Sequence, residues 1–384
     1  MKRLSSILLV FCAITCAGKQ DLLSRSAAKQ TTETKLPTTD SLRLIFVGDV
    51  MGHGMQITGA WRDGGNAAYN YLPVFQYVKD YISAADVAFA NLEVTLAGAP
   101  YSGYPQFSSH LSLAVALQDA GFDVLATANN HSLDRGKKGL ERTIDVLDSL
   151  GIPHTGTFKD LAAWQNNHPL LIEQKGFKLA LLNYSYGTNG IATEKPNIVN
   201  IIDSARMASD LVKAKAMQPD CIIAFLHWGE EYHNTESATQ RKMAKFLARN
   251  GCNLIIGGHP HVVQPFDKLP TANGDFVPVI YSMGNFVSNQ RDRYRDGGIS
   301  LDITLVKTDG VVRIASCAYE PFWVYRFPLN GVSVFRLIPV NDAIQNPEKY
   351  NIGSYDKTLM LRFYEDTQKL LPQLPFSGFF SKIQ

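Results

Sequence analysis

Three side chains suited to metal and acid–base chemistry lie close together in the stretch 128–136, which reads Ala-Asn-Asn-His-Ser-Leu-Asp-Arg-Gly. Asn130 offers a neutral oxygen to a cation, and His131 offers an imidazole that titrates near neutral pH. Asp134 is spaced to hold that imidazole in one tautomer and to stabilise its protonated form. A polar turn closed by an Asx cap explains the stretch by itself equally well.

The place of this stretch in the expected secondary structure favours a site. Residues 122–126 are apolar and predict a buried strand, and residues 138–150 have helical spacing. In open α/β sheets, ligands bind beyond the carboxyl ends of strands, where side chains from several loops meet. The stretch therefore lies where a catalytic loop is expected.

Four other predicted strands also end in residues that can bind a metal. These strands are short apolar runs at 42–47, 87–90, 221–226 and 254–256. A single His at a strand end is more often structural, but five such ends in one chain are difficult to attribute to packing. His, Asn and carboxylate side chains together suit zinc, manganese or iron. The candidates are Asp49, Asn91 with Glu93, Asn130 with His131, His227, and His259 with His261.

The remaining histidines and the cysteines show no pattern of a site. Beyond Cys16 there are three cysteines, Cys221, Cys252 and Cys317, an odd count that suggests neither a disulfide framework nor a thiolate metal site. The other histidines are interpreted as surface or structural residues, with His53 kept open as an exception. They are His53, His110, His154, His168 and His233.

The order of predicted elements indicates an α/β fold. Strands at 42–47, 87–90, 122–126, 152–156, 178–184, 221–226 and 254–256 alternate with helices at 70–83, 111–120, 139–150, 203–216 and 237–249. This order is expected of parallel β/α units. A later strand at 276–282 and a hairpin at 299–306 and 311–318 predict a second sheet that packs on the first. A further helix is expected at 356–371.

The first residues resemble an export signal. Lys2 and Arg3 precede an apolar segment, 4–14, that is too short to span a bilayer. The run Ala-Ile-Thr-Cys at 13–16 resembles a lipobox, which would make Cys16 a lipidated first residue; simple cleavage near Ala17 is the alternative. We therefore expect a signal at 1–15 and a polar tether at 16–41, with the protein lipid-anchored at the cell envelope, or else periplasmic or secreted.

The charge of the chain argues against nucleic-acid binding. Removal of the predicted signal takes away two of the 37 lysines and arginines and leaves 35 against 35 acidic residues. A nucleic-acid footprint needs clustered positive charge. We expect no nucleic-acid partner.

The motifs at the strand ends resemble those of the CapA capsule-synthesis family, which is linked to poly-gamma-glutamate capsules and belongs to the calcineurin-like metallophosphoesterase superfamily. The resemblance covers about residues 42–290, in order and at family-like spacing. The motifs that carry it are Gly48-Asp49-Val50-Met51, Ala90-Asn91-Leu92-Glu93, Ala120-Gly121-Phe122-Asp123, Ala128-Asn129-Asn130-His131 with Asp134 and Gly136, His227-Trp228-Gly229 with Glu231-Tyr232, Gly258-His259-Pro260-His261-Val262-Val263-Gln264-Pro265, and Tyr281-Ser282 with Gly284-Asn285-Phe286.

This resemblance implies a four-layer α/β/β/α sandwich over residues 42–330, with a C-terminal extension, 331–384, packed on it. It also implies one or two divalent ions, manganese, zinc or iron, near the sheet edges. Glu93 stands near the position of the superfamily's bridging Asp, with Asn91 a weaker candidate, and His131 with Asp134 matches an acid dyad. The residues that match metal ligands are Asp49, Asn130, His227, His259 and His261.

One residue departs from the superfamily pattern. The superfamily usually has Asp-x-His at the first strand, and here the third residue is Met51. His53 cannot replace that histidine, because it is two positions out of register. The departure implies a weakly held first metal or a site for one metal.

Four residues beside the expected ligands are assigned to substrate binding: Asn91, Trp228, Glu231 and Asn285. Trp228 has three aromatic neighbours in the motifs, Tyr232, Tyr281 and Phe286. Such rings can stack on a sugar or a base, although aromatic residues beside a sheet edge more often serve packing.

Three functions remain open from the sequence. The first is metal-assisted hydrolysis at the cell envelope, of a phosphoester or phosphodiester or, by family name alone, of a glutamyl amide. The second is a lipid-anchored accessory protein that binds an anionic polymer, with membrane capsule-synthesis proteins as partners. The third is a structural domain with a degenerate site. Fold alone does not decide among them.

Overall fold

Strand β1 (Thr39–Val50) lies at the centre of the larger of two sheets in the computed structural model, which describes residues 39–271 and 274–382. Its side chains alternate between two buried faces. Leu44 and Phe46 belong to one apolar cluster, and Ile45 and Val47 belong to another. The expected signal, Cys16 and the tether up to residue 38 lie outside the described residues; residues 39–41 are part of β1.

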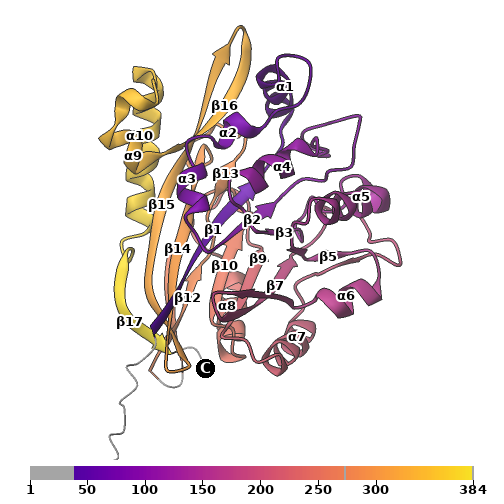
Figure 1. Cartoon of the computed structure of the whole chain (residues 1–384), viewed down its shortest axis with the longest axis vertical. Coiled ribbons are helices and arrows are strands. Elements are labelled where there is room, and N and C mark those ends of the chain that lie inside the picture. Colours follow the sequence, from indigo (N-terminus) through magenta and orange to yellow (C-terminus); the bar gives the residue numbers. More distant parts are fainter. Residues whose placement is uncertain (1–38, 272–273, 383–384) are drawn as a thin grey trace, which may run out of the picture. The chain divides into compact units, whose positions relative to one another are not determined.

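The larger sheet joins the first strands of the chain to the last ones (Figure 1). Parallel strands lie on one side of β1, and antiparallel strands lie on the other. The order is β16 (Val332–Pro339), β15 (Val311–Leu329), β14 (Gly297–Thr308), β1, β2 (Val87–Leu92), β3 (Val124–Ala126) and β4 (His154–Thr155), with β13 (Asn285–Val287) on β1 and β17 (Phe376–Lys382) on β15.

The smaller sheet is built from the middle of the chain. Strands β7, β9 and β10 run parallel, as the alternation of strands and helices predicted, and β12, which lies outside that predicted alternation, runs parallel to β10. Its order is β11 (Phe266–Pro270), β12 (Phe276–Ile280), β10 (Leu254–Gly258), β9 (Cys221–His227), β7 (Phe177–Ser185) and β6 (Leu170–Gln174). A separate pair is formed by β5 (Thr157–Phe158) and β8 (Ile198–Val199).

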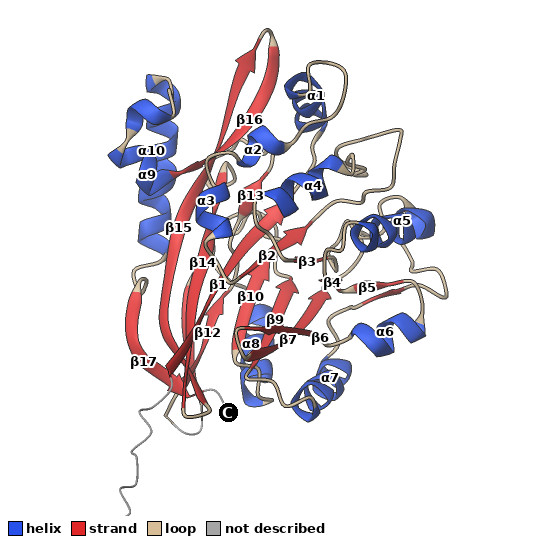
Figure 2. Ribbon diagram, viewed as in Figure 1, coloured by secondary structure: helices blue, strands red, loops and turns tan. Residues whose placement is uncertain are grey.

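The two sheets pack face to face, and helices cover their outer faces (Figure 2). Phe46 and Phe89 from the larger sheet share the central cluster with Phe225 and Ile256 from the smaller one. Each such side chain contributes about 1.5–3 kcal/mol through burial. The larger sheet is covered by α1 (Gly54–Asp63), α2 (Leu72–Phe75), α3 (Lys79–Ser83), α4 (Ser112–Asp119) and α5 (Gly136–Ser149), and the smaller sheet by α7 (Ser204–Ala216) and α8 (Ala238–Arg249).

This arrangement confirms the predicted α/β/β/α sandwich and corrects the predicted membership of its sheets. The late hairpin, β14 and β15, does not start a second sheet, because β14 pairs with β1. The single helix predicted at 70–83 is also wrong. Around residues 76–78 the backbone bonds reach back only three residues, from Gln76 to Pro73 and from Val78 to Phe75, so α2 and α3 are separate.

The C-terminal helices cover a part of the larger sheet that the smaller sheet does not. Cys317 on β15 lies in the cluster between the sheets, whereas Trp323, on the same face of that strand, packs under α9 (Val340–Gln345) and α10 (Ser354–Leu370). The sheet runs across residue 330, the expected domain boundary, because Leu329 of β15 pairs with Val332 of β16.

The structure also bears on the cysteines and on membrane-spanning helices. Cys221, Cys252 and Cys317 are buried and free, so they act as small apolar side chains. In the part of the chain that is described, no helix combines the length and apolar character needed to cross a bilayer. Helix α6 (Leu161–Asn167) and the 3-10 turn Pro347–Lys349 complete the elements.

Candidate metal centre

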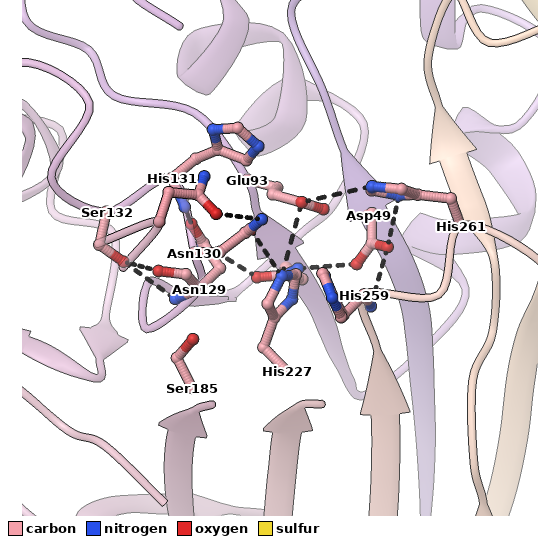
Figure 3. A network of polar contacts seen from close by, with 12 residues as sticks. Asp49, Glu93, Asn129, Asn130, His131, Ser132, Ser185, His227, His259 and His261 are labelled. Atoms are coloured by element: carbon pink, nitrogen blue, oxygen red, sulfur yellow. Dashed lines mark hydrogen bonds and ion pairs between the residues drawn. The ribbon is translucent and has the colours of Figure 1, made fainter. Parts of the chain in front are cut away.

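Side chains from both sheets meet where the strands end (Figure 3). Asp49 is near the end of β1, Glu93 directly follows β2, and His227 is the last residue of β9. The loops after β3 and β10 supply the others. The structure thus brings together all six residues that the sequence assigned to a metal: Asp49, Glu93, Asn130, His227, His259 and His261.

Asp49 is a fully buried carboxylate that is held by three neighbours. Its Oδ1 accepts a 2.7 Å hydrogen bond from Asn91 Nδ2, and its Oδ2 accepts a 3.1 Å bond from the backbone N–H of His259. His261 Nδ1 lies 3.3 Å from Oδ2. Burial raises the pKa of Asp49, but the contacts with His261 and Asn91 outweigh it, so this pKa lies below its ordinary value.

Glu93 is also fully buried, but neither of its carboxylate oxygens has a hydrogen-bond partner among the described residues. Burial and the charge of Asp49 raise the pKa of Glu93 well above its ordinary value. The Oε1 atom lies 3.5 Å from His227 Nε2 and 3.8 Å from His261 Nε2. A buried carboxylate without donors is costly, and a bound cation is the natural partner for it.

Two of the imidazoles, those of His227 and His259, are neutral at neutral pH. Burial, followed by the neighbouring histidines, lowers the pKa of His227 well below its ordinary value and lowers the pKa of His259 to about 3. His259 Nδ1 is buried and has no hydrogen-bond partner among the described residues. Neutral imidazoles of this kind are metal ligands.

The segment that carries His259 and His261 has an unusual backbone. Both histidines have positive φ angles, 96° and 57°. Such conformations are unfavourable for residues other than glycine and cluster at functional sites. Gly258 is required just before them, because a Cβ there would lie 2.7 Å from Asp49 Oδ1.

The ligands form two overlapping groups that share Glu93. One group is Asp49, Glu93 and His261, and the other is Glu93, His227 and His259; within each group the ligand atoms lie within 4.8 Å of one another. Asn130 joins the second group, because its Oδ1 is 2.9 Å from His227 Nε2. Together with the unpartnered atoms of Glu93 and His259, these donors fit one or two divalent cations.

Two residues near the first strand do not join these groups. Met51 is buried in the apolar cluster between the larger sheet and its helices. His53 precedes α1, and its Nδ1 lies 3.1 Å from Gln56 Oε1. Burial lowers the pKa of His53 to about 4. The side chain two positions after Asp49 is thus apolar and lies outside both ligand groups.

His131 and Asp134 form a buried pair beside the metal ligands. His131 Nδ1 and Asp134 Oδ2 are 2.7 Å apart, and the same oxygen accepts a 2.7 Å bond from the backbone N–H of Phe107. The Phe107 ring meets the His131 ring edge-on at 4.6 Å. The pair lines a cavity of about 340 Å³. The geometry is that of an imidazole positioned by a carboxylate.

The Asx turn, which was the alternative interpretation of residues 128–136, is also present in the structure. Asn129 Oδ1 accepts from the backbone N–H of His131 at 3.1 Å, and Asn129 Nδ2 donates to the Leu92 carbonyl at 2.8 Å. The sequence analysis gave Asn129 no role. It orients His131 and ties the loop to β2, so the cap and the site coexist.

The four residues assigned to substrate binding have different positions. Asn91 lies among the ligands, with its Nδ2 between Asp49 and His227 Nδ1. Asn285 Oδ1 is 3.1 Å from His261 Nδ1 and so orients that ring. Trp228 is buried in the outer cluster of the smaller sheet, and its Nε1 donates to the Tyr281 carbonyl. Glu231 lines the cavity beside His131.

Tyr186 is a site residue that the sequence analysis missed. It follows Ser185, the last residue of β7, and is half-exposed. Its ring centroid is 4.5 Å from that of His259. Its place directly after a parallel strand is the signal that could have identified it.

A family match adds to this geometry. Residues 43–290 match the family model described as bacterial capsule synthesis protein PGA_cap, which is well over half of the chain. The chain belongs to this family. The family predicted from the strand-end motifs is therefore confirmed.

The match is supported by relatives whose names refer to capsule, PGA or polyglutamine synthesis. A capsule biosynthesis protein CapA of Bacillus anthracis is 27% identical over 88% of this chain and 78% of its own length. A PGA biosynthesis protein CapA of Bacillus subtilis is 27% identical over 70% of each chain. A probable polyglutamine synthesis accessory protein of Mycobacterium tuberculosis is 25% identical over 54% of this chain and 57% of its own.

Solved structures with similar topology include a calcineurin-like phosphoesterase of Bacillus subtilis, with 15% identity and a TM-score of 0.46 over 86% of this chain and 99% of that one. An NAD nucleotidase of Haemophilus influenzae has 12% identity and a TM-score of 0.45 over 87% of this chain and 68% of that one.

Proposed function

We propose that this member of the PGA_cap family is a metal-dependent hydrolase that acts in the assembly of a capsule polymer at the cell envelope. The observation that carries the proposal is the unpartnered, fully buried carboxylate of Glu93 between His227 and His261. Buried polar atoms in structural domains are nearly always hydrogen-bonded. A centre that leaves this carboxylate unpaired is prepared for a cation.

The metal ligands and the pair of His131 and Asp134 would have different roles in hydrolysis. A divalent ion held by these ligands would act as a Lewis acid that polarises the scissile group and activates water. His131 Nε2 donates a proton to the leaving atom, while Asp134 holds Nδ1 and stabilises the imidazolium. Asn129 and Phe107 fix this pair, so that the proton is delivered from one position.

The substrate is proposed to be a phosphoester or phosphodiester, with a glutamyl amide as the second class. The cavity beside His131 is lined by neutral polar groups such as Gln106, Asn130 and Asn189 and by the acidic residues Asp134 and Glu231. None of its lining residues in the described chain is a lysine or arginine. Anionic charge on the substrate would therefore be met by the metal centre and His131. The names of the two Bacillus relatives motivate the link to capsule polymers.

The first test is the hydrolysis of a generic aryl phosphodiester by the manganese-loaded protein, with the His131→Ala variant alongside. We expect turnover by the native protein, no turnover by the variant, and the same metal content in both, because His131 acts on the leaving group. Loss of metal from the variant would make His131 a ligand instead. A metal-loaded native protein that turns over neither phosphodiesters nor polyglutamate would contradict the hydrolase.

A non-catalytic accessory protein that binds an anionic polymer is the second candidate. Met51 favours it, since an apolar residue stands where the superfamily places a metal ligand. The Mycobacterium relative, which is named as a probable polyglutamine synthesis accessory protein, supports the same role. Such a protein would bind poly-gamma-glutamate in a sedimentation assay and would give no turnover even when loaded with metal.

Export and a lipid anchor at Cys16 are part of the proposal, motivated by residues 1–16 alone. Fractionation of cells that express the native chain or Cys16→Ser tests the anchor. We expect the native chain in the membrane fraction and the variant outside it.

A further inference from the structure

Glu231 lies between the two halves of the centre, close to one histidine of each. One of its carboxylate oxygens lies within 4.8 Å of ligand nitrogens of both His259 and His261. That spacing suits donors that share one ion. His259 is itself buried with an unpartnered Nδ1. The carboxylate of Glu231 and two imidazoles thus form a third potential ligand group that overlaps the other two.

The backbone that carries Glu231 is fixed to the segment that carries the histidines. The N–H of Trp228 donates to the Gly258 carbonyl at 3.1 Å, and the N–H of Tyr232 donates to the Pro260 carbonyl at 2.8 Å. Positive φ angles at Gly229 and Tyr232, 96° and 69°, turn the loop back toward that segment. Glu231 therefore lies on a loop whose position is set on both sides of it.

Side chains hold the same loop from the outside. Gln264 Nε2 donates to the carbonyls of His233 and Thr235 at 2.8 and 3.1 Å. The guanidinium of Arg295 lies 3.6 Å from the centre of the Tyr232 ring. The Arg295 carbonyl also accepts from Asn285 Nδ2, whose amide oxygen orients His261. Arg295 therefore contacts the loop that carries Glu231 through its guanidinium and, through Asn285, helps to orient His261.

The neighbouring acid, Glu230, provides a contrast. Both glutamates are exposed, but the Oε2 of Glu230 approaches the exposed His233, at 3.9 Å. Glu230 belongs to none of the ligand groups among the described residues. Two adjacent glutamates on one loop therefore differ in the single property that matters here, which is their distance from His259 and His261.

We propose that Glu231 is a metal ligand that compensates for the histidine replaced by Met51. This inference rests on the metal centre of the proposed function but not on hydrolysis. Bound to the same ion as His261, Glu231 would give the half of the centre that contains Asp49 and Glu93 three carboxylates and one imidazole. Oxygen-rich sets of this kind suit manganese better than zinc. Glu231 would thus give the two halves different metal preferences.

The test uses the full-length protein, freed of metal and titrated separately with manganese and zinc chloride in a calorimeter. Three forms are compared: native, Glu231→Gln and the matched control Glu230→Gln, which loses the same charge one residue away. We expect Glu231→Gln to bind one of two manganese equivalents about tenfold more weakly or worse. Its zinc binding should change less, and Glu230→Gln should match the native protein.

The outcomes separate the inference from the function on which it rests. Manganese binding by Glu231→Gln that equals the native protein would overturn the ligand role and leave the centre intact. Equal weakening in Glu230→Gln would also overturn it, because a general charge effect would then suffice. An absence of metal binding by the native protein would overturn both. Thermal unfolding of the metal-free forms checks that all three are folded.

Discussion

The two halves of the metal centre share Glu93 and differ in what completes them. One half adds His227 at the end of β9 and His259 directly after β10, with the oxygen of Asn130, on the loop after β3, close by. The other adds Asp49 and His261, and the residue two positions after Asp49 is the buried Met51. The first half is rich in nitrogen and the second is rich in carboxylate.

The largest expected effect comes from the residue that both halves share. Replacement of Glu93 by Met, which has a similar volume and no charge, should abolish metal binding at both halves. The same change removes a buried, unpartnered carboxylate, so the metal-free protein should become more stable by about 1–3 kcal/mol. Metal analysis and urea unfolding measure the two effects. A variant that is less stable and still binds metal would show that Glu93 has a structural role.

Two matched variants test the two halves of the metal centre separately. His227→Ala should remove one metal equivalent and leave the half with Asp49 and His261, and His261→Ala should do the converse. Each loss should reduce the affinity of its own half by about a hundredfold. Manganese and zinc titrations of the two variants show which half prefers which ion. Identical titrations would mean that the centre holds one ion bound by both groups.

The pH dependence of metal binding follows from the shared carboxylate. The raised pKa of Glu93 keeps it protonated in the metal-free protein at pH values where a free Glu is ionised, whereas His227 and His259 are already neutral. Metal binding must therefore release the Glu93 proton, and the apparent affinity should rise with pH up to that pKa. Calorimetry in buffers of different ionisation enthalpy should detect about one proton per centre. A pH-independent affinity would contradict an ionisable Glu93.

The smallest effect on the metal is expected at Met51. Met51→His puts an imidazole two positions after Asp49, but the side chain at this position lies in an apolar cluster. The metal affinity should stay within about twofold, and the protein should lose about 1–3 kcal/mol of stability, because an imidazole would be buried without a partner. Calorimetry and urea unfolding measure both quantities. A gain of tenfold or more in affinity would show that the side chain can reach the centre.

The ligands could be predicted from the sequence because the sheet positions them. Parallel strands bring their carboxyl ends together, so polar residues after apolar runs predicted the meeting of Asp49, His227 and His259. The burial of Trp228 away from the cavity follows from the same alternation, since its neighbour His227 faces the ligands. Glu231 was expected beside the ligands, as a substrate-binding residue, but its closeness to both His259 and His261 could not be predicted, because it depends on the turn at Gly229 and Tyr232.

The alternation of strands and helices was also predictable, but the membership of the late strands was not. The apolar pattern of residues 299–306 identifies a strand and says nothing of its partner. In the structure Ser300 pairs with Val47, far away in sequence. The predicted helix at 70–83 had the right pattern of apolar residues, but this pattern does not show that the backbone tightens around residues 76–78.

The pairing of β1 with β14 determines how much of the chain is needed to complete the larger sheet. The family match ends at residue 290, whereas β14 begins at Gly297 and bonds to β1 from Thr39 to Val47. A chain shortened to the matched residues would leave the central strand of the larger sheet as an open edge, and such edges aggregate. The segment that the family shares in sequence is therefore shorter than the smallest piece worth expressing.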